Sequence, residues 1–317
     1  MTAIRVHLLI GCTASGKSAV AFELARRMGA EILSVDSMKI YRRMDIGTAK
    51  PTPEQCRQIP HHLIDIVEPT ETYSLGRFVD DADRAIRAID ERRRPIVAEG
   101  GTMLFVRGLV SGVFEGPAAD PAFRKQLRDR AAREGIAALH AQLQAVDPEA
   151  AGRIHPNDLR RIERALEVYE TTGRPISALQ TQWEASPGSR YDCRIVALRR
   201  DKEMTSRRIN LRVRAMIEAG LLDEVRTLLA EPGGIGPQAA QAVGYAEFIA
   251  HLRGELSFDE AVERIKINTR RLAKNQRTWM RRLPDVRWVD AQEDDPIERI
   301  ADRVSEAWHE SHTSGRP

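Results

Sequence analysis

The chain of 317 residues is 42% hydrophobic and 30% charged, with a formal net charge of +3. This composition is typical of a soluble globular protein with a sizeable core, and no apolar run reaches transmembrane length. The N-terminus lacks the apolar segment of a signal peptide, and the three cysteines are far apart with no CxxC pair, so we expect a cytoplasmic protein without membrane contact, disulfides or a zinc site.

The first hundred residues alternate between short apolar runs and amphipathic stretches. The apolar runs predict strands at residues 4–10, at Glu31–Val35, near Leu63–Val67 and at Pro95–Ala98. The amphipathic stretches predict a helix at Lys17–Met28 and a second helix that Ser74 caps and Pro95 ends. Strands that alternate with helices predict an α/β fold with a parallel sheet wrapped by helices.

The middle of the chain has a purely helical pattern. Helices are predicted at Pro121–Glu134, Ile136–Val146, Pro148–Ile154, Asp158–Thr171 and Ser177–Trp183. Strand patterns return at Cys193–Leu198 and Val286–Val289, with long helices between them. We therefore expect an all-helical insertion at residues 119–185 within an α/β core formed by residues 1–118 and 186–317.

The segment Gly11-Cys12-Thr13-Ala14-Ser15-Gly16-Lys17-Ser18 fits the phosphate-loop pattern GxxxxGK[ST] and lies between a predicted strand and a predicted helix. Glycines let successive backbone N–H groups turn inward around an anion, and the helix N-terminus adds partial positive charge. We expect Lys17 to reach the outer phosphate and the Ser18 hydroxyl to be a Mg²⁺ ligand. The predicted diphosphate-binding residues are Gly11, Thr13, Ala14, Ser15, Gly16, Lys17 and Ser18. The core is thus expected to be like that of the phosphate-loop NTPases.

Three segments follow predicted strands: the phosphate loop, Asp36 and Gly100–Thr102. Ligands of such sheets bind at the carboxyl ends of the strands, so we expect the three segments to share one crevice. A kinase or hydrolase with this loop usually also has an apolar strand that ends in a metal-holding Asp. Here the best such strand ends in Glu99 before two glycines, a poor match that leaves open a diphosphate that is not a nucleotide.

Positive charge is concentrated in the second half of the chain. Residues 264–282 include no acid and eight basic side chains: Arg264, Lys266, Arg270, Arg271, Lys274, Arg277, Arg281 and Arg282. Five of them recur at helical steps and form a basic stripe: Lys266, Arg270, Lys274, Arg277 and Arg281. A charged stripe is usually only a solvated face, but an all-basic one suits a nucleic-acid backbone. We therefore expect Lys274 and Arg277 to bind RNA.

Several motifs, in chain order, strongly resemble those of the tRNA dimethylallyltransferases. They are G-x-T-A-S-G-K-S at 11–18 and the segments Ser34–Pro51, Pro60–Asp65, Gly100–Phe105, His155–Asp158, Arg164–Val168 and Ala242–Tyr245. Together they are far more specific than the phosphate loop alone. The resemblance implies a phosphate-loop α/β domain with a helical insertion. It also implies transfer of the five-carbon group of dimethylallyl diphosphate to N6 of the adenosine 3′ to the anticodon.

The resemblance implies roles for four residues. Asp36 resembles the general base that takes a proton from the adenine amine, although by itself it would more simply cap a turn. Thr102 can donate its hydroxyl to the bridging oxygen of the diphosphate, and it can also cap the helix that follows. Arg212 matches the arginine that clamps the diphosphate, with Arg208 as the alternative. Lys17 adds positive charge at the leaving group.

The resemblance also implies contacts with the anticodon stem-loop of tRNA. The matching residues are Asp36, Ser37, Met38, Lys39, Arg124, Arg160, Arg161, Arg164, Gln241, Gly244 and Tyr245, beside Lys274 and Arg277 of the basic stripe. The target adenosine must be flipped out of its stack to reach the base. The expected cofactor is Mg²⁺, the expected substrates are dimethylallyl diphosphate and tRNA, and the expected state is a monomer.

Four residues depart from the family pattern. Cys12 stands in place of a proline, Lys39 of a glutamine, Arg43 of a glycine and Glu99 of an apolar residue. Three other functions stay open at this point: a small-molecule kinase that consumes ATP, a prenyl transferase acting on free adenine nucleotides, and a non-catalytic RNA-binding module. The helical insertion and the basic stripe favour tRNA as the acceptor.

Overall fold

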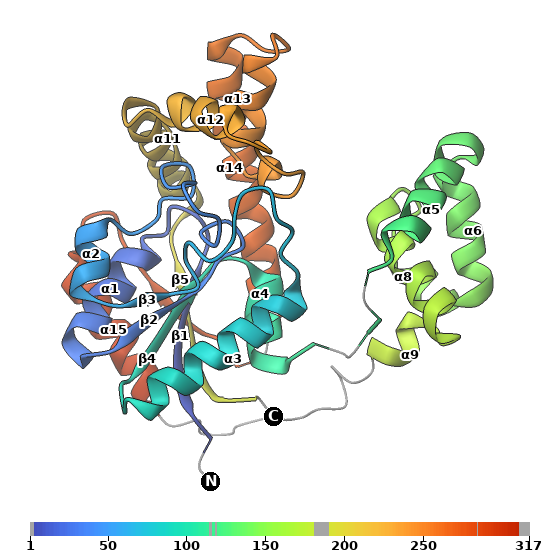
Figure 1. Cartoon of the computed structure of the whole chain (residues 1–317). Coiled ribbons are helices and arrows are strands. Elements are labelled where there is room, and N and C mark those ends of the chain that lie inside the picture. The colour runs from blue at the N-terminus through green and yellow to red at the C-terminus, as the bar shows by residue number, and fades with distance from the viewer. Residues whose placement is uncertain (1–2, 114–115, 118, 181–189, 284, 311–317) are drawn as a thin grey trace. The chain divides into compact units, whose positions relative to one another are not determined.

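The computed structural model describes residues 3–113, 116–117, 119–180, 190–283 and 285–310. The chain forms two compact units (Figure 1). The larger unit combines residues 1–110 with residues 190–317, and the smaller unit comprises residues 111–189. The smaller unit thus interrupts the larger one in sequence, and its described residues form helices only.

A six-stranded parallel sheet forms the centre of the larger unit. Its strands are β1 (Arg5–Gly11), β2 (Glu31–Val35), β3 (His61–His62), β4 (Ile96–Gly100), β5 (Asp192–Arg199) and β6 (Arg287–Asp290). They lie in the order β3-β2-β4-β1-β5-β6. Because β2, β4 and β1 are neighbours and all parallel, their carboxyl ends bring Asp36, Gly100 and Gly11 to one edge. The predicted α/β fold is confirmed.

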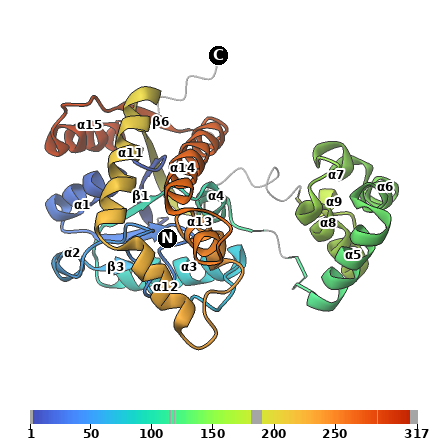
Figure 2. The ribbon, with the colours of Figure 1, turned by 90° about the horizontal axis from the view of Figure 1, so that it is seen from above.

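Helices cover both faces of this sheet (Figure 2). The helices of the larger unit are α1 (Lys17–Met28), α2 (Pro53–Gln58), α3 (Leu75–Glu91), α4 (Met103–Ser111), α11 (Lys202–Glu218), α12 (Leu221–Ala230), α13 (Tyr245–Leu252), α14 (Phe258–Met280) and α15 (Ile297–His309), with a 3₁₀ turn at Ala239–Gln241. Of these, α12 and α13 lie beyond the end of the sheet (Figure 1). On one face, α1 and α15 pack on Leu9 and Val97 through an apolar cluster that includes Leu24 and Trp308. Helices α3 and α4 cover the opposite face.

The predicted third strand near Leu63–Val67 is wrong. The strand comes earlier, at His61–His62, and Leu63 and Asp65 have φ values of 61° and 54°. A strand requires negative φ, so the chain turns here, and Val67 makes only an isolated bridge with Tyr41. Leu63 and Val67 are buried although they lie outside any strand, and Ile64 and Ile66 are only partly buried.

The smaller unit is a compact group of helices. They are α5 (Pro121–Glu134), α6 (Ile136–Val146), α7 (Pro148–Arg153), α8 (Leu159–Thr172) and α9 (Ile176–Gln180), and residues 181–183 of the last predicted helix lie outside the described residues. Leu139, Leu143 and Ile162 are fully buried in its core. Asp147 caps α7 through Ala150 N and also accepts a hydrogen bond from Ser177 N, so it ties α7 to α9.

None of the helices described here is long and apolar enough to span a lipid bilayer.

Gly100 allows the close approach of two strands that positions the loop after β4. A Cβ atom on Gly100 would lie 2.1 Å from the carbonyl oxygen of Val35, its partner in the β2–β4 ladder. That oxygen belongs to the backbone and has no freedom to move aside. Only glycine therefore fits at the point where β4 turns toward Thr102.

We expect Gly100→Ala to destabilise the larger unit by about 3 kcal/mol or more, because the strands must separate. Gly76→Ala is the matched control, since Gly76 lies in α3 and its added Cβ would meet only Ser74 Oγ, at 3.8 Å. The control should shift stability by at most about 1 kcal/mol, in the stabilising direction. Urea unfolding of both variants tests this expectation, and equal stabilities would contradict it.

Candidate active site

The phosphate loop joins β1 to α1 in a conformation that points its N–H groups inward. Ala14 and Gly16 have φ values of 61° and 92°, and Ser15 N donates to Cys12 O at 3.1 Å. Such alternation of backbone conformation creates a concave row of N–H groups at the start of α1. The predicted strand, loop and helix are all present around Gly11–Ser18.

Side chains from distant parts of the chain hold this loop. The carbonyl of Ser15 accepts from Arg200 Nε at 2.7 Å, and the carbonyl of Ala14 accepts from Arg208 Nε at 2.9 Å. Arg208, the alternative diphosphate clamp, is thus already bonded to the loop. Gln276 on α14 accepts from Thr13 N at 2.8 Å and donates to Gly101 O at 2.9 Å. It connects two of the predicted site segments, and no sequence pattern had indicated it.

Asp36 and Thr102 follow neighbouring strands and stabilise the same turn. Asp36 Oδ1 accepts from Met38 N at 2.8 Å and from Lys39 N at 3.3 Å. Thr102 Oγ1 accepts from Ser37 N at 3.0 Å and donates to Ser37 Oγ at 3.2 Å. Asp36 is therefore a turn cap, while its second carboxylate oxygen lies outside these two bonds. Thr102 precedes α4, but its hydroxyl bonds to Ser37.

Charged groups meet around the start of α1. Burial lowers the pKa of Lys17, while Glu99 and Asp36 oppose that effect. Arg212 on α11 shows the same balance, with a pKa lowered by burial against the charges of Asp36 and Glu99. The structure thus brings the predicted residues Lys17, Asp36 and Arg212 into one electrostatic cluster.

Glu99, which the sequence showed to be a poor match to a metal-holding Asp, also belongs to this cluster. Its Oε2 accepts from Ser18 Oγ at 3.2 Å, and its Oε1 lies 2.6 Å from Lys39 Nζ. Burial by itself raises the pKa of Glu99, but the charges of Lys39 and Lys17 and the hydrogen bonds from Lys39 and Ser18 outweigh it and hold that pKa at about 2. Among the described residues no group of three or more His, Cys, Asp or Glu could hold a metal.

The predicted RNA-binding residues of the larger unit divide into buried and exposed ones. Tyr245 is buried and donates to Glu224 Oε1 at 2.5 Å, and Glu224 accepts the N–H groups of residues 45–47. Gly244 is also buried and donates to Glu247 at 2.7 Å. Gln241 is exposed and able to reach a partner outside the chain. Ser37, Met38 and Lys39 lie in the turn that Asp36 caps.

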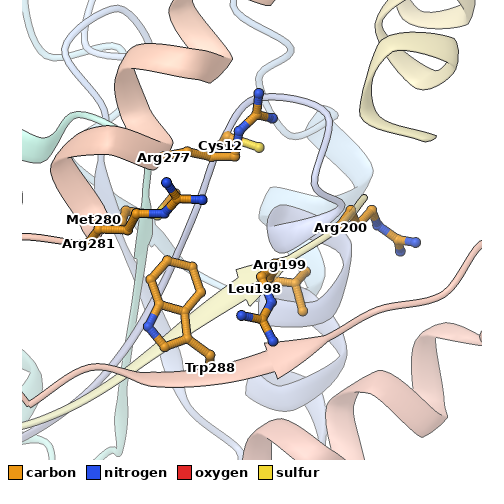
Figure 3. A pocket seen from close by; sticks show the side chains of 8 residues that line it. All are labelled: Cys12, Leu198, Arg199, Arg200, Arg277, Met280, Arg281 and Trp288. Carbon is orange, nitrogen blue, oxygen red and sulfur yellow. The ribbon is translucent and has the colours of Figure 1, made fainter. Parts of the chain in front are cut away.

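The basic stripe does not form one free face of α14. Lys274 and Arg281 are exposed, but Arg270 donates to Asn210 at 2.5 Å and Lys266 pairs with Glu263. Arg277 is half-buried and extends toward Cys12 of the phosphate loop (Figure 3). Arg277 and Cys12 line a cavity of about 170 Å³ together with Leu198, Arg199, Arg200, Met280, Arg281 and Trp288. Burial raises the pKa of the Cys12 thiol, and Arg277 opposes that shift.

In the smaller unit, two of the four predicted arginines are bound internally. Glu167 is fully buried, and both Arg124, at 2.7 Å, and Arg164, at 2.6 Å, pair with its carboxylate. Arg160 and Arg161 are exposed, and Arg161 lies 3.2 Å from Asp158. Arg124 and Arg164 therefore have a structural task, because a buried carboxylate requires neutralising partners.

Comparison with known proteins agrees with this architecture. Residues 39–283 match the model of the family described as IPP transferase. A tRNA dimethylallyltransferase of Anaeromyxobacter dehalogenans is 48% identical over 303 residues, 96% of this chain and 98% of that protein. The tRNA dimethylallyltransferase of Geobacter metallireducens is 46% identical over 286 residues, 90% of this chain and 92% of that protein.

Two solved structures are also similar. The tRNA isopentenylpyrophosphate transferase of Bacillus halodurans has a TM-score of 0.68 at 38% identity and covers 96% of each chain. A eukaryotic dimethylallyltransferase acting on tRNA has a TM-score of 0.80 at 27% identity, over 96% of this chain and 78% of that one. The fold and the family match define a prenyl transferase with a phosphate-loop core. The chain belongs to the IPP transferase family, whose named relatives here are tRNA dimethylallyltransferases.

We expect Gln276→Ala to weaken binding of inorganic diphosphate about tenfold or more, because small displacements of positioned groups are costly. Thr13 N and Gly101 O would lose the side chain that joins them. Asn275→Ala, an exposed neighbour on α14, is the control. Calorimetric titration of both variants gives the affinities, and a Gln276→Ala affinity within twofold of wild type would refute the positioning role.

Proposed function

We propose that the chain transfers the dimethylallyl group of dimethylallyl diphosphate to N6 of the adenosine 3′-adjacent to the anticodon in tRNA, with release of diphosphate. The observation that carries this proposal is the meeting of Asp36, Thr102 and the phosphate loop at one sheet edge in a member of the IPP transferase family. The reaction forms a bond from N6 to the allylic carbon and breaks the bond from that carbon to the diphosphate oxygen.

Asp36 is the proposed general base. An exocyclic adenine amine is a weak nucleophile and must lose a proton as the new bond forms. Oδ1 of Asp36 is bound by the turn, which fixes the carboxylate and leaves Oδ2 as the proton acceptor. The cap and the base are thus two roles of one side chain, because the cap orients the base.

The remaining site residues act on the leaving diphosphate. Negative charge accumulates there, and donors that are already oriented stabilise it without reorganisation. Lys17, Arg212 and the loop N–H groups other than those of Thr13 and Ser15, which donate to Gln276 and Cys12, supply positive charge. The Thr102 hydroxyl, once it turns from Ser37 Oγ, is the proposed donor to the bridging oxygen. The Ser18 hydroxyl is an oxygen ligand of the kind that Mg²⁺ prefers, and the ion would neutralise diphosphate charge.

The exposed cations are the proposed contacts to tRNA. Lys274 and Arg281 on α14 and Arg160 and Arg161 on α8 are exposed, so they remain available to phosphates. The stacked target base must be flipped to reach Asp36, which costs a few kcal/mol. We place this reaction in the cytoplasm and in a monomer.

Asp36→Asn tests the base and keeps the turn, since an amide oxygen can accept from Met38 N as the carboxylate does. Transfer of radiolabelled dimethylallyl to unmodified tRNA with Mg²⁺ should fall about 10²- to 10⁴-fold, the usual contribution of a general base. The melting temperature should stay at the wild-type value. Transfer by the variant at the wild-type rate would remove Asp36 from the chemistry.

The wild-type assay also separates the competing functions. Label in free adenine nucleotides but not in tRNA would reassign the acceptor. ATP consumption without any prenyl transfer would favour a small-molecule kinase. Binding of tRNA without either reaction would leave a non-catalytic RNA-binding module.

Lys274→Ala should weaken tRNA binding and reduce the slope of log affinity against log salt by about 1, because one phosphate contact is lost. Arg84→Ala is the control, since Arg84 is an exposed cation on α3 that pairs with Asp81. Filter binding at several salt concentrations measures both slopes. Equal slopes for Lys274→Ala and wild type would exclude Lys274 from the RNA interface.

A further inference from the structure

Two opposite charges are buried together beside the phosphate loop. Lys39 and Glu99 are 5% and 4% exposed, and their Nζ and Oε1 atoms lie 2.6 Å apart. Lys39 belongs to the turn after β2, and Glu99 is the penultimate residue of β4. Both positions depart from the family pattern, and the structure joins the two departures in one ion pair.

Stability alone does not account for this pair. Removing two charges from water is costly, and a well-packed apolar pair in the same space is often equally or more stable. A buried ion pair is therefore weak evidence for stability. Its location is more informative, because the carboxylate also reaches the proposed metal ligand of the phosphate loop.

The hydrogen bonds around Ser18 have a definite direction. Ser18 donates its hydroxyl proton to Glu99 Oε2 at 3.2 Å. A hydroxyl has one proton and two acceptor lone pairs, so donation to Glu99 directs the lone pairs away from the carboxylate. Lys39 Nζ donates a longer hydrogen bond, of 3.5 Å, to the same hydroxyl oxygen and a shorter one, of 2.6 Å, to Glu99, so one lone pair of Ser18 is left without a partner in these two bonds. Ser18 thus has a fixed orientation while Lys39 is held mainly by Glu99.

We propose that Glu99 is a positioning residue for Ser18. It accepts the hydroxyl proton and so leaves the lone pair of Ser18 that does not meet Lys39 for the diphosphate and its Mg²⁺. Lys39 neutralises Glu99, so that a carboxylate can lie beside a diphosphate site without repelling the anion. The ammonium and carboxylate carry no net charge as a pair, and the positive charge of Lys17 and Arg212 remains available to the substrate.

This inference rests on the proposed function for the identity of the anion and the ion. It concerns the group that accepts the hydrogen bond of the Ser18 hydroxyl and not the proton transfer at Asp36. Its failure is therefore separable from a failure of prenyl transfer, because binding of inorganic diphosphate reports on Ser18 without tRNA.

Two double variants isolate the acceptor at constant charge. K39Q/E99Q keeps an oxygen at position 99 that accepts from Ser18, whereas K39Q/E99V has none at that position, and in both variants the pair has zero net charge as in wild type. Calorimetric titration with inorganic diphosphate at a series of Mg²⁺ concentrations gives the Mg²⁺ concentration for half-maximal affinity. We expect K39Q/E99Q to stay within about twofold of wild type and K39Q/E99V to need at least fivefold more Mg²⁺.

Ser18→Ala provides the decisive control. If Glu99 acts through Ser18, adding Ser18→Ala should abolish the difference between the two double variants, as in a double-mutant cycle. Equal Mg²⁺ requirements of K39Q/E99Q and K39Q/E99V, or a difference that survives Ser18→Ala, would overturn the proposal. If K39Q/E99V does not fold, K39M/E99M fills the same space with apolar side chains and serves the same comparison.

Prenyl transfer to tRNA is measured separately on each folded variant. A raised Mg²⁺ requirement for diphosphate binding in K39Q/E99V supports the positioning role even if the acceptor proves not to be tRNA. An unchanged requirement refutes that role even if transfer to tRNA is observed in wild type.

Discussion

An anion can use the N–H groups of the phosphate loop only while the loop keeps the backbone conformation that turns them inward and its carbonyls away. This constraint shapes the larger unit. Arg200 and Arg208 bind two of those carbonyls, and Gln276 fixes Thr13 and Gly101. All three side chains come from the part of the chain that follows the helical unit. The phosphate loop is therefore one short segment of the sequence, but the side chains that hold it follow β5 or lie on α11 and α14.

The same edge of the sheet must hold a carboxylate base next to a site for an anion. Lys17, Lys39 and Arg212 provide three positive charges, and Asp36 and Glu99 provide two negative ones. The excess of positive charge favours binding of diphosphate. Lys39 pairs with Glu99 and neutralises it, and the same carboxylate accepts a hydrogen bond from Ser18. Parallel neighbours β2, β4 and β1 make this arrangement possible, because their ends release Asp36, Thr102 and the loop side by side.

Local patterns predicted local structure well. Helix Lys17–Met28 and strand Glu31–Val35 have the predicted bounds, since apolar periodicity determines which face is buried. The turn at Leu63 has left-handed residues that no glycine marked, so its apolar run suggested a strand. Gln276 carried no signal because its partners lie more than 170 residues away. Arg124 and Arg164 were predicted to contact tRNA, because the sequence does not show that both pair with the buried Glu167.

The pairing of Lys39 with Glu99 illustrates what position-by-position comparison overlooks. Either residue alone would be a buried charge without this partner. Glu99 is the penultimate residue of a strand that is buried throughout, so its carboxylate requires a cation within reach. Because β2 lies beside β4, with Ser34 opposite Glu99, the turn after β2 is the nearest source of one, and Lys39 is in that turn. The order of the strands thus brings Lys39 and Glu99 together in one ion pair, and Glu99 also accepts a hydrogen bond from Ser18 of the phosphate loop.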